Sequence, residues 1–257
     1  MHYVVLTTGS CGNCYAFFDG ENTLIIDDGV THKKLTENLQ RHDIPLSSVR
    51  ALLLTHLHPD HSKGAGAFQR KIGAPVFMSE TAFNAGRTVM ERQKIDMASV
   101  ATFSFGDSID IPGFHITPFR TYHDSEGSAG YFFSTGRSSV FLMTDTGRIP
   151  EGAEELASSA RVKFIEANYD DAMLDAGPYS EALRRRIRGV YGHLSNEEAV
   201  SFASASSHHG DSVYFIHLSA NNNTPEKVRA LASDRIESGI FCHVCERGET
   251  VEGYLDE

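Results

Sequence analysis

The sequence contains few cysteines and no long stretch of apolar residues. Its 257 residues include only four cysteines, which is too few for a disulfide-stabilised scaffold of this length. No apolar segment approaches the roughly 18 residues that a membrane-spanning helix needs. The opening stretch MHYVVLTTGS has no basic leader ahead of an apolar segment, so it does not resemble a signal peptide. We therefore expect a soluble, cytoplasmic protein that does not bind membranes.

The four cysteines fall into two pairs with the spacing of zinc ligands. Cys11 and Cys14 form one pair, and Cys242 and Cys245 form the other. One zinc site built from all four thiolates is compatible with this spacing. The sequence favours the alternative, in which the four thiols are reduced, two of them lie on strands, and none has an assigned role.

The sequence also lacks an excess of positive charge. With 34 acidic and 23 basic residues, its formal net charge is −11, which argues against a broad basic surface for nucleic acid. A local basic patch is compatible with this composition, and bound divalent cations would offset several negative charges. Because repeats, low-complexity segments and Pro-, Gly- or Ser-rich linkers are also lacking, we expect one domain covering residues 1–257.

Short apolar runs closed by glycine or a polar residue predict strands in both halves of the chain, with amphipathic helices between them. The predicted strands lie within residues 2–9, 14–20, 23–29, 51–56, 75–79, 103–111, 114–123, 130–136, 139–145, 161–169, 212–219 and, as a closing pair, 240–254. The predicted helices lie near residues 31–42, 64–71, 80–93, 151–160, 170–188, 195–206 and 224–233. This order indicates an α/β fold with four αββα layers, in which two packed mixed β-sheets are flanked by helices.

Four residues of the types that bind metals stand together after the predicted strand LLLT. They are His56, His58, Asp60 and His61, in the stretch LTHLHPDH. Imidazole and carboxylate groups bind borderline divalent metals. We expect the first two histidines to hold one ion, and Asp60 and His61, in a loop stiffened by Pro59, to hold another roughly 3.5–4 Å away. A surface loop with incidental histidines is the alternative, which four such residues in six positions disfavour.

Two ions need further ligands, and three candidates stand near the ends of predicted strands. His123 closes FHITPFRTYH, Asp145 closes SVFLMTD, and His217 lies within VYFIHLS. We expect His123 to complete the first site and His217 the second, while the two oxygens of Asp145 bridge both ions. Such a centre ionises a shared water near neutral pH, and Asp60 or Asp145 would orient that water for attack.

With HLHPDH, His123, Asp145 and His217, the whole chain resembles the metallo-β-lactamase superfamily. This resemblance implies an αββα sandwich, two divalent ions (Zn, Mn or Fe) and a structural role beside the metal loop for Asp27. Within the superfamily, TGSCGNCY, FIEANYDDAML, GPYSEALRRRI, GHLSNEEA and HLSANNNTPE resemble the YycJ/WalJ group. That group is associated with 5′-to-3′ exonuclease activity on double-stranded DNA and with mismatch repair. Cys11 stands where the group usually has Ser, a departure expected to alter substrate contacts and not metal ligation.

Other branches of the superfamily fit less well. The segment between Asp145 and His217 is too short to contain the β-CASP domain of another nuclease branch, and the flexible arm of tRNase Z is not evident. Glyoxalase II would need a different context for the third motif and a glutathione-binding tail, and a secreted β-lactamase would need an export signal.

The stretch GHLSNEEA places His193 shortly before a predicted helix. Ser195 followed by Glu198 is a capping box, so a helix begins there. Because a helix N-terminus presents free N–H groups, it is a potential phosphate site. His193 at this position could bind a phosphate oxygen or donate a proton to a leaving alkoxide. The alternative is a loop histidine that is hydrogen-bonded to water.

Further substrate contacts are predicted from a basic run and from the resemblance. Arg184 and Arg185 lie in the run LRRRIR before GHLSN, where arginines suit a DNA backbone. Equally, this run is compatible with a solvated helix face on which Glu181 pairs with Arg185. Asn13, near the expected site, and Ser219 of the motif His-Leu-Ser are the other candidate substrate contacts.

These observations lead to one principal hypothesis and two alternatives. The principal hypothesis is a binuclear metal-dependent phosphodiesterase, most simply a DNA exonuclease, with DNA as its partner. One alternative is a small-molecule phosphodiesterase or thioester hydrolase on the same scaffold. The other is a non-catalytic metal-binding regulatory protein, which the complete ligand set disfavours.

Overall fold

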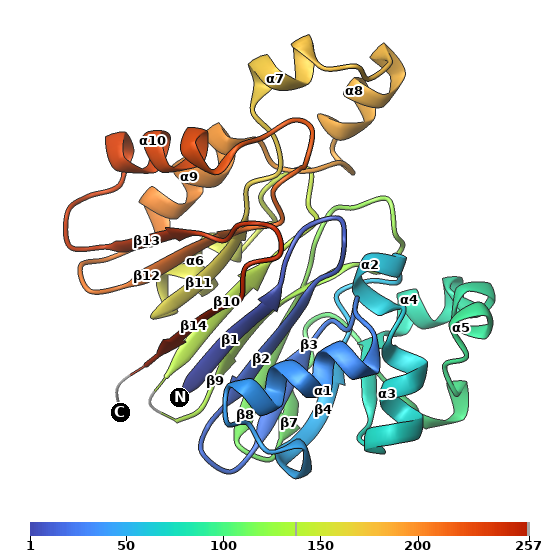
Figure 1. The fold of residues 1–257 in the computed structure, drawn as a ribbon. Helices are drawn as coiled ribbons and strands as arrows, with labels where there is room; N and C mark the ends of the chain where they lie inside the picture. Colours follow the sequence, from blue (N-terminus) through green and yellow to red (C-terminus); the bar gives the residue numbers. More distant parts are fainter. Residues whose placement is uncertain (137, 256–257) are drawn as a thin grey trace.

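Two seven-stranded β-sheets form the centre of the protein (Figure 1). The computed structural model describes residues 1–136 and 138–255. From edge to edge, the first sheet contains β14 (Val251–Tyr254), β1 (His2–Thr7), β2 (Cys14–Phe18), β3 (Thr23–Ile26), β4 (Val49–Leu53), β5 (Val76–Ser79) and β6 (Val100–Phe103). The second contains β13 (Phe241–Val244), β12 (Ser212–Ile216), β11 (Val162–Glu166), β10 (Ser139–Met143), β9 (Ala129–Ser134), β8 (Phe114–Arg120) and β7 (Ile109–Ile111). Each sheet has parallel and antiparallel pairs, so the prediction of mixed sheets is confirmed.

Helices cover the outer faces of both sheets (Figure 1). Those on the side of the first sheet are α1 (His32–Arg41), α3 (Ala65–Ile72), α4 (Glu80–Ala85) and α5 (Arg87–Gln93). Those on the side of the second are α6 (Ala153–Ser158), α9 (Asn196–Ser206) and α10 (Pro225–Arg235). Two short 3₁₀ helices, η1 (Leu46–Ser48) and η2 (Met97–Ser99), lead into β4 and β6. No helix among the residues described is long and apolar enough to cross a bilayer.

Three apolar clusters join these layers. One lies between the sheets, where the rings of Phe17 and Phe133 meet edge to face with centroids 4.7 Å apart. The other two lie between each sheet and its helices. Strand β1 shows why its sequence is continuously apolar: Tyr3 belongs to the cluster between the sheets, whereas Val4 belongs to the cluster under the helices. Because both faces are buried, neither face needs polar residues, and the predicted αββα order is confirmed.

Several predicted elements are divided in the structure. The helix expected over residues 80–93 becomes α4 and α5, which meet at Gly86. A Cβ at Gly86 would lie 2.7 Å from the Ala82 carbonyl oxygen, which is backbone and cannot easily move, so this close approach favours glycine. The helix expected near 170–188 becomes α7 (Asp171–Ala176) and α8 (Glu181–Ile187), separated by a segment containing Pro178, which cannot continue a helix.

Two strand predictions were wrong, one in the number of strands and one in how the strands pair. The segment 103–111 was expected as one strand, but it links the end of β6 in the first sheet to β7 in the second. The closing strands β13 and β14 were expected as a pair, but β13 pairs with β12 and β14 pairs with β1. Each of these segments therefore crosses from one sheet to the other.

The strands that carry the candidate site residues end at one edge of the sandwich. In the first sheet β3 and β4 are parallel, and in the second β10, β11 and β12 are parallel. Their carboxyl ends therefore point the same way within each sheet. Helices α7 and α8 stand outside the four layers, beyond this edge (Figure 1).

Candidate metal centre and active site

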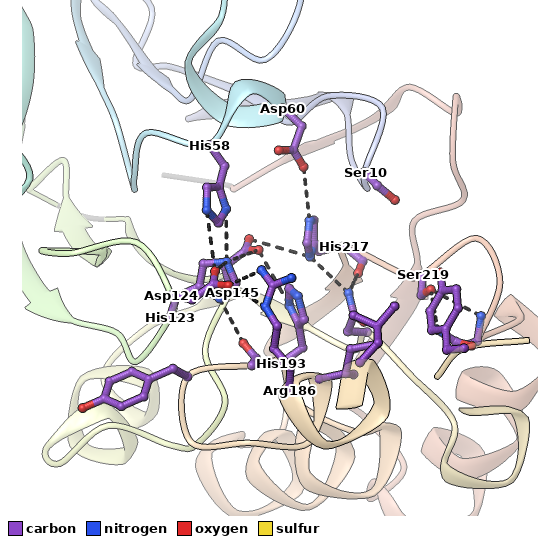
Figure 2. Close-up of a pocket in the computed structure, with 17 residues that line it drawn as sticks. Ser10, His58, Asp60, His123, Asp124, Asp145, Arg186, His193, His217 and Ser219 are labelled. Carbon is purple, nitrogen blue, oxygen red and sulfur yellow. Dashed lines mark hydrogen bonds and ion pairs between the residues drawn. The ribbon is translucent and has the colours of Figure 1, made fainter. Parts of the chain in front are cut away.

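The segment after β4 that carries the histidine cluster is partly helical. Asp60 and His61 were predicted in a loop, but they lie in the short helix α2 (Pro59–Ser62). Pro59 is the first residue of this helix, where its fixed φ is favourable and its missing N–H has no cost. Figure 2 shows His58 and Asp60 extending from this segment toward the same cavity.

The three histidines predicted for the first ion lie together. The ligand atoms of His56, His58 and His123 are all within 4.8 Å of one another, and His123 Nε2 is 3.3 Å from His58 Nδ1. His56 Nε2 is buried and has no hydrogen-bond partner in the part of the chain that the structure describes. Because buried nitrogen atoms are rarely left without a partner, this arrangement fits three imidazoles that hold a cation.

The residues predicted for the second ion form an adjacent group. Ligand atoms of Asp60, His61 and His217 lie within 4.8 Å of one another. Asp60 Oδ2 is 3.7 Å from His61 Nε2 and 3.9 Å from His217 Nε2. His217 Nε2 is also buried, and no described residue hydrogen-bonds to it. This group therefore fits a second cation, bound by two imidazoles and one carboxylate.

Asp145, the predicted bridging residue, lies between the two groups. Its Oδ1 is 3.6 Å from His123 Nε2 of the first group, and its Oδ2 is 3.3 Å from His61 Nε2 of the second. Burial opposes ionisation of Asp145, but the neighbouring His217 and His61 hold its pKa well below the usual range. A carboxylate in this position can offer one oxygen to each of two cations.

Buried partners fix the orientation of the imidazoles. Asp27, which is completely buried, accepts a hydrogen bond from His61 Nδ1 at 2.7 Å and one from the Thr55 amide at 2.8 Å. His123 Nδ1 donates to the Gly192 carbonyl at 3.0 Å. Each bond keeps the proton on Nδ1, which makes Nε2 the unprotonated nitrogen of the ring. Asp27 thus lies beside the metal loop, as the resemblance implied.

Three residues of this centre have left-handed backbone conformations. Asp27, Asp145 and His217 have φ angles of 58°, 50° and 57°, and each follows the end of a strand. Such conformations cost about 1–3 kcal/mol each for residues other than glycine, and they are concentrated at functional sites. The fold therefore keeps these side chains in place against a local energetic cost.

Glu166, at the end of β11, belongs to this centre but was missed by the sequence analysis. Its Oε1 accepts hydrogen bonds from His193 Nδ1 at 2.7 Å and His217 Nδ1 at 2.9 Å. Its Oε2 accepts from the amides of Thr146 and Leu194. Despite its burial, the adjacent His193 helps to lower the pKa of Glu166 to about 2. The signal was present in FIEANY, because Glu166 ends a buried strand just as the predicted ligands do.

The capping box before α9 is confirmed, but the phosphate site predicted there is not. The Ser195 hydroxyl accepts from the Glu198 amide, and the Glu198 side chain accepts from the Ser195 amide. The Leu194 amide donates to Glu166, and the Asn196 amide donates to a carbonyl outside the helix. These N–H groups are therefore engaged within the protein. His193 itself lines the cavity, and its side chain is 21% exposed.

The two substrate contacts predicted outside the basic run have different positions. Ser219 lines the cavity. Asn13 is completely buried, and its Nδ2 lies 2.9 Å from His61 Nε2 and 3.2 Å from the Gly9 carbonyl. The prediction that Asn13 contacts substrate was wrong, because its side chain supports the metal loop from behind and does not reach the cavity.

The basic run contributes one arginine to the cavity, and it is neither of the two predicted. Arg185 pairs with Glu181, which corresponds to the alternative of a solvated helix face, and Arg184 donates to a backbone carbonyl of α7. Arg186 lines the cavity, and its Nε donates to Asp124 Oδ2 at 2.7 Å. Asp124 Oδ1 lies 3.2 Å from His123 Nε2. Figure 2 shows Arg186 and His193 on the opposite side of the cavity from His58 and Asp60.

The cysteines lie apart from this centre. Cys14 and Cys242 are on strands, as expected, and Cys11 is exposed. Burial raises the pKa of the Cys14 and Cys245 thiols, which keeps them protonated. No cysteine belongs to any metal-ligand group found among the described residues.

Comparisons with known proteins agree with this geometry. The family model described as the beta-lactamase superfamily domain matches residues 23–218. Exodeoxyribonuclease YycJ of Bacillus anthracis is 30% identical over 242 residues, covering 94% of this chain and 91% of the relative. Exodeoxyribonuclease WalJ of Streptococcus pneumoniae is 31% identical over 225 residues, covering 87% and 84%. The structure of the metallo-beta-lactamase fold protein YhfI from Bacillus subtilis matches with a TM-score of 0.72 at 19% identity, covering 98% of this chain and 99% of that one, which supports the fold.

Proposed function

The chain belongs to the metallo-β-lactamase superfamily and is a YycJ/WalJ-like, metal-dependent hydrolase; we propose that its substrate is DNA, which it degrades as an exonuclease. The observation that carries this proposal is the pair of ligand groups joined by Asp145, with Arg186 and His193 facing them across one cavity. The similarity to YycJ and WalJ extends the proposal to 5′-to-3′ digestion of double-stranded DNA and to a role in mismatch repair.

The residues of the centre fit two divalent ions, with Asp145 shared between them. His56, His58 and His123 would hold the first ion, and Asp60, His61 and His217 the second. When bound, such ions lower the pKa of a water and neutralise charge on a phosphoryl group. The unpartnered, buried His56 Nε2 and His217 Nε2 support this assignment within the described residues.

His193 is the residue best placed to move a proton in this reaction. Glu166 accepts from its Nδ1 at 2.7 Å, which orients the ring and directs Nε2 away from Glu166. A partly exposed imidazole in the cavity wall can protonate the leaving alkoxide of a phosphodiester. Asp60 or Asp145 would orient the attacking water.

Arg186 is the residue best placed to bind substrate phosphate. Its guanidinium is fixed by Asp124, whose Oδ1 lies 3.6 Å from His58 Nε2 and 3.2 Å from His123 Nε2. Guanidinium groups match the geometry of phosphate oxygens. In a protein of net charge −11, one arginine at the catalytic cavity attracts a phosphate locally without a broad basic surface.

A nuclease panel tests the proposal. Protein loaded with Mn²⁺ would be given duplex DNA labelled at the 5′ or the 3′ end, and separately a chromogenic phosphodiester. We expect immediate release of the 5′ label as mononucleotides while the 3′ label stays on long fragments. Hydrolysis of the small ester with intact DNA would instead favour the small-molecule phosphodiesterase. A thioester would be offered in the same panel, and hydrolysis of the thioester alone would favour a thioester hydrolase.

The role of His193 has its own test. His193→Ala is expected to lower turnover by roughly 10²- to 10⁴-fold, with the metal content of the unmodified protein. His115→Ala is the matched control, because His115 is an exposed histidine bonded to Asp110 outside the cavity. Loss of metal from His193→Ala would show that His193 is a ligand and not a proton donor.

A further inference from the structure

An exposed apolar pair lies between α8 and His193. Val190 is 47% exposed and Tyr191 is 62% exposed. Single exposed apolar residues are ordinary on protein surfaces, but Tyr191 also lines the cavity that contains the metal ligands. The remainder of that cavity is mostly charged or polar, so Tyr191 gives its rim an aromatic surface beside the reacting groups.

The backbone that carries this pair is held rigidly. The Gly192 amide donates to the Gly189 carbonyl at 2.7 Å, and the His193 amide donates to the Ile187 carbonyl at 2.9 Å. Gly147 packs against this turn so closely that a Cβ there would lie 2.1 Å from the Gly189 carbonyl oxygen. Because the backbone of this turn is already ordered, a ligand that binds its side chains need not order the backbone as well.

Tyr191 lies beside a second aromatic residue, Tyr122, which is paired with the cation of Arg148. Its ring centroid is 6.5 Å from that of Tyr122, and the Arg148 guanidinium lies 3.7 Å from the centroid of the Tyr122 ring. Tyr122 directly precedes the ligand His123. This aromatic and cationic surface therefore adjoins the first metal group.

We propose that Tyr191, supported by Tyr122, is a stacking platform for the base of the terminal nucleotide whose phosphate is cleaved. The proposal rests on the proposed function and specifies its substrate, a strand end with an unpaired terminal base. The cavity of about 250 Å³ is small beside ordinary ligand sites, so it admits the phosphate while the base remains at the rim. Every base offers a π face, so this platform does not read sequence.

The test combines an enzyme variant with a substrate that lacks the base. Wild type and Tyr191→Ala would each be assayed, in single turnovers, on DNA whose terminal nucleotide is normal or abasic. Loss of one stacked base corresponds to a fall of about 5- to 160-fold in kcat/KM. We expect that fall for wild type on abasic DNA and for Tyr191→Ala on normal DNA. Because both changes remove the same contact, Tyr191→Ala on abasic DNA should be no slower than either of them alone.

Two further variants serve as controls. Tyr191→Phe keeps the ring and is expected to retain most of the rate on normal DNA. Tyr254→Ala removes another exposed ring, 66% exposed on β14 and outside the cavity, and is expected to act as wild type. Metal content and circular dichroism would confirm that Tyr191→Ala is folded.

The outcomes separate this inference from the proposed function. Wild type without activity on DNA would overturn both. Active wild type together with a Tyr191→Ala variant of equal rate would overturn the platform alone. If the losses in kcat/KM from Tyr191→Ala and from the abasic substrate multiply, Tyr191 has a structural role. If Tyr191→Ala changes the oligomeric state and not the rate on DNA, Tyr191 belongs to a protein interface. Either result also overturns the platform.

Discussion

Replacing Glu166 by Gln tests the central hydrogen-bond arrangement of the site. The carboxylate accepts four hydrogen bonds, two from imidazoles through Oε1 and two from backbone amides through Oε2. A glutamine has the same size but only one oxygen, so its NH₂ group must face one of these two pairs of donors. Each buried donor left without an acceptor costs about 1–3 kcal/mol, hence about 2–6 kcal/mol for the pair.

Both orientations of the glutamine damage the site. If its NH₂ faces His193 and His217, these rings can accept from it only by moving their proton to Nε2. His217 Nε2 is the predicted metal-binding atom, and a protonated nitrogen cannot bind a metal. If its NH₂ faces the Thr146 and Leu194 amides, the loop before α9 loses both bonds and His193 loses its fixed position.

We therefore expect Glu166→Gln to lower kcat by roughly 10²- to 10³-fold and metal affinity by about 10- to 100-fold. The assays are kcat on DNA and on the chromogenic ester, and metal content by elemental analysis after dialysis. Glu198→Gln is the matched control: it makes the same change in the capping box of α9, where the one glutamine oxygen can still accept both bonds from Ser195, and it should leave kcat unchanged. A Glu166→Gln enzyme with wild-type metal content and a kcat within about threefold of wild type would refute this reasoning.

Three other predictions follow from the contacts described. Arg186→Ala should reduce kcat/KM on DNA, and the plot of log kcat/KM against log salt concentration should become shallower by roughly one unit. Arg185→Ala, measured in the same salt series, should leave kcat/KM and this slope nearly unchanged. Asn13→Ala removes the side-chain bonds that tie the backbone of Gly9 to that of Asp60, so metal content after dialysis should fall without a rise in KM for DNA in metal-saturated enzyme; a higher KM alone would restore Asn13 as a substrate contact. Lys163→Met removes the 2.8 Å partner of the buried Asp211 carboxylate but leaves Arg161 at 3.0 Å, so urea unfolding should show a loss of about 1–3 kcal/mol with normal activity at low temperature, and an unchanged midpoint would contradict this.

The residues of the two candidate metal groups could be found from the sequence because each is tied to a local pattern. His56 to His61 form a contiguous cluster, and His123, Asp145 and His217 each stand at or near the end of an apolar run, where a strand delivers them to one edge of the sheets. Glu166 has the same position, but a lone carboxylate at a strand end has no neighbouring ligand in sequence to distinguish it.

Contacts that depend on packing could not be predicted in this way. Asn13 stands in a polar loop near the site, and only the structure shows that its side chain points into the protein toward His61. Likewise Arg184, Arg185 and Arg186 are consecutive, and the orientation of α8 alone decides which of them reaches the cavity. The capping box gave the start of α9 correctly, but it could not show that its amides are already bonded.

The partition of strands between the sheets depends on contacts between distant residues. The segments around residues 103–111 and 240–254 show ordinary strand patterns, and nothing local indicates that each contains strands of different sheets. A strand pattern specifies which residues are extended but not which partner they pair with.

The pairing of β14 with β1 has a consequence for how the protein folds. Strand β1 lies between β14 and β2, and its register joins His2 to Tyr254 across nearly the whole chain. Because β14 follows every other strand in the sequence, the first sheet keeps β1 as an open edge until the remainder of the chain is in place. An open edge can recruit strands from other molecules, and pairings this distant in sequence form slowly. Removal of residues 251–254 would therefore take no lining residue from the catalytic cavity. It would leave β1 as an exposed edge strand, at which molecules can aggregate during folding.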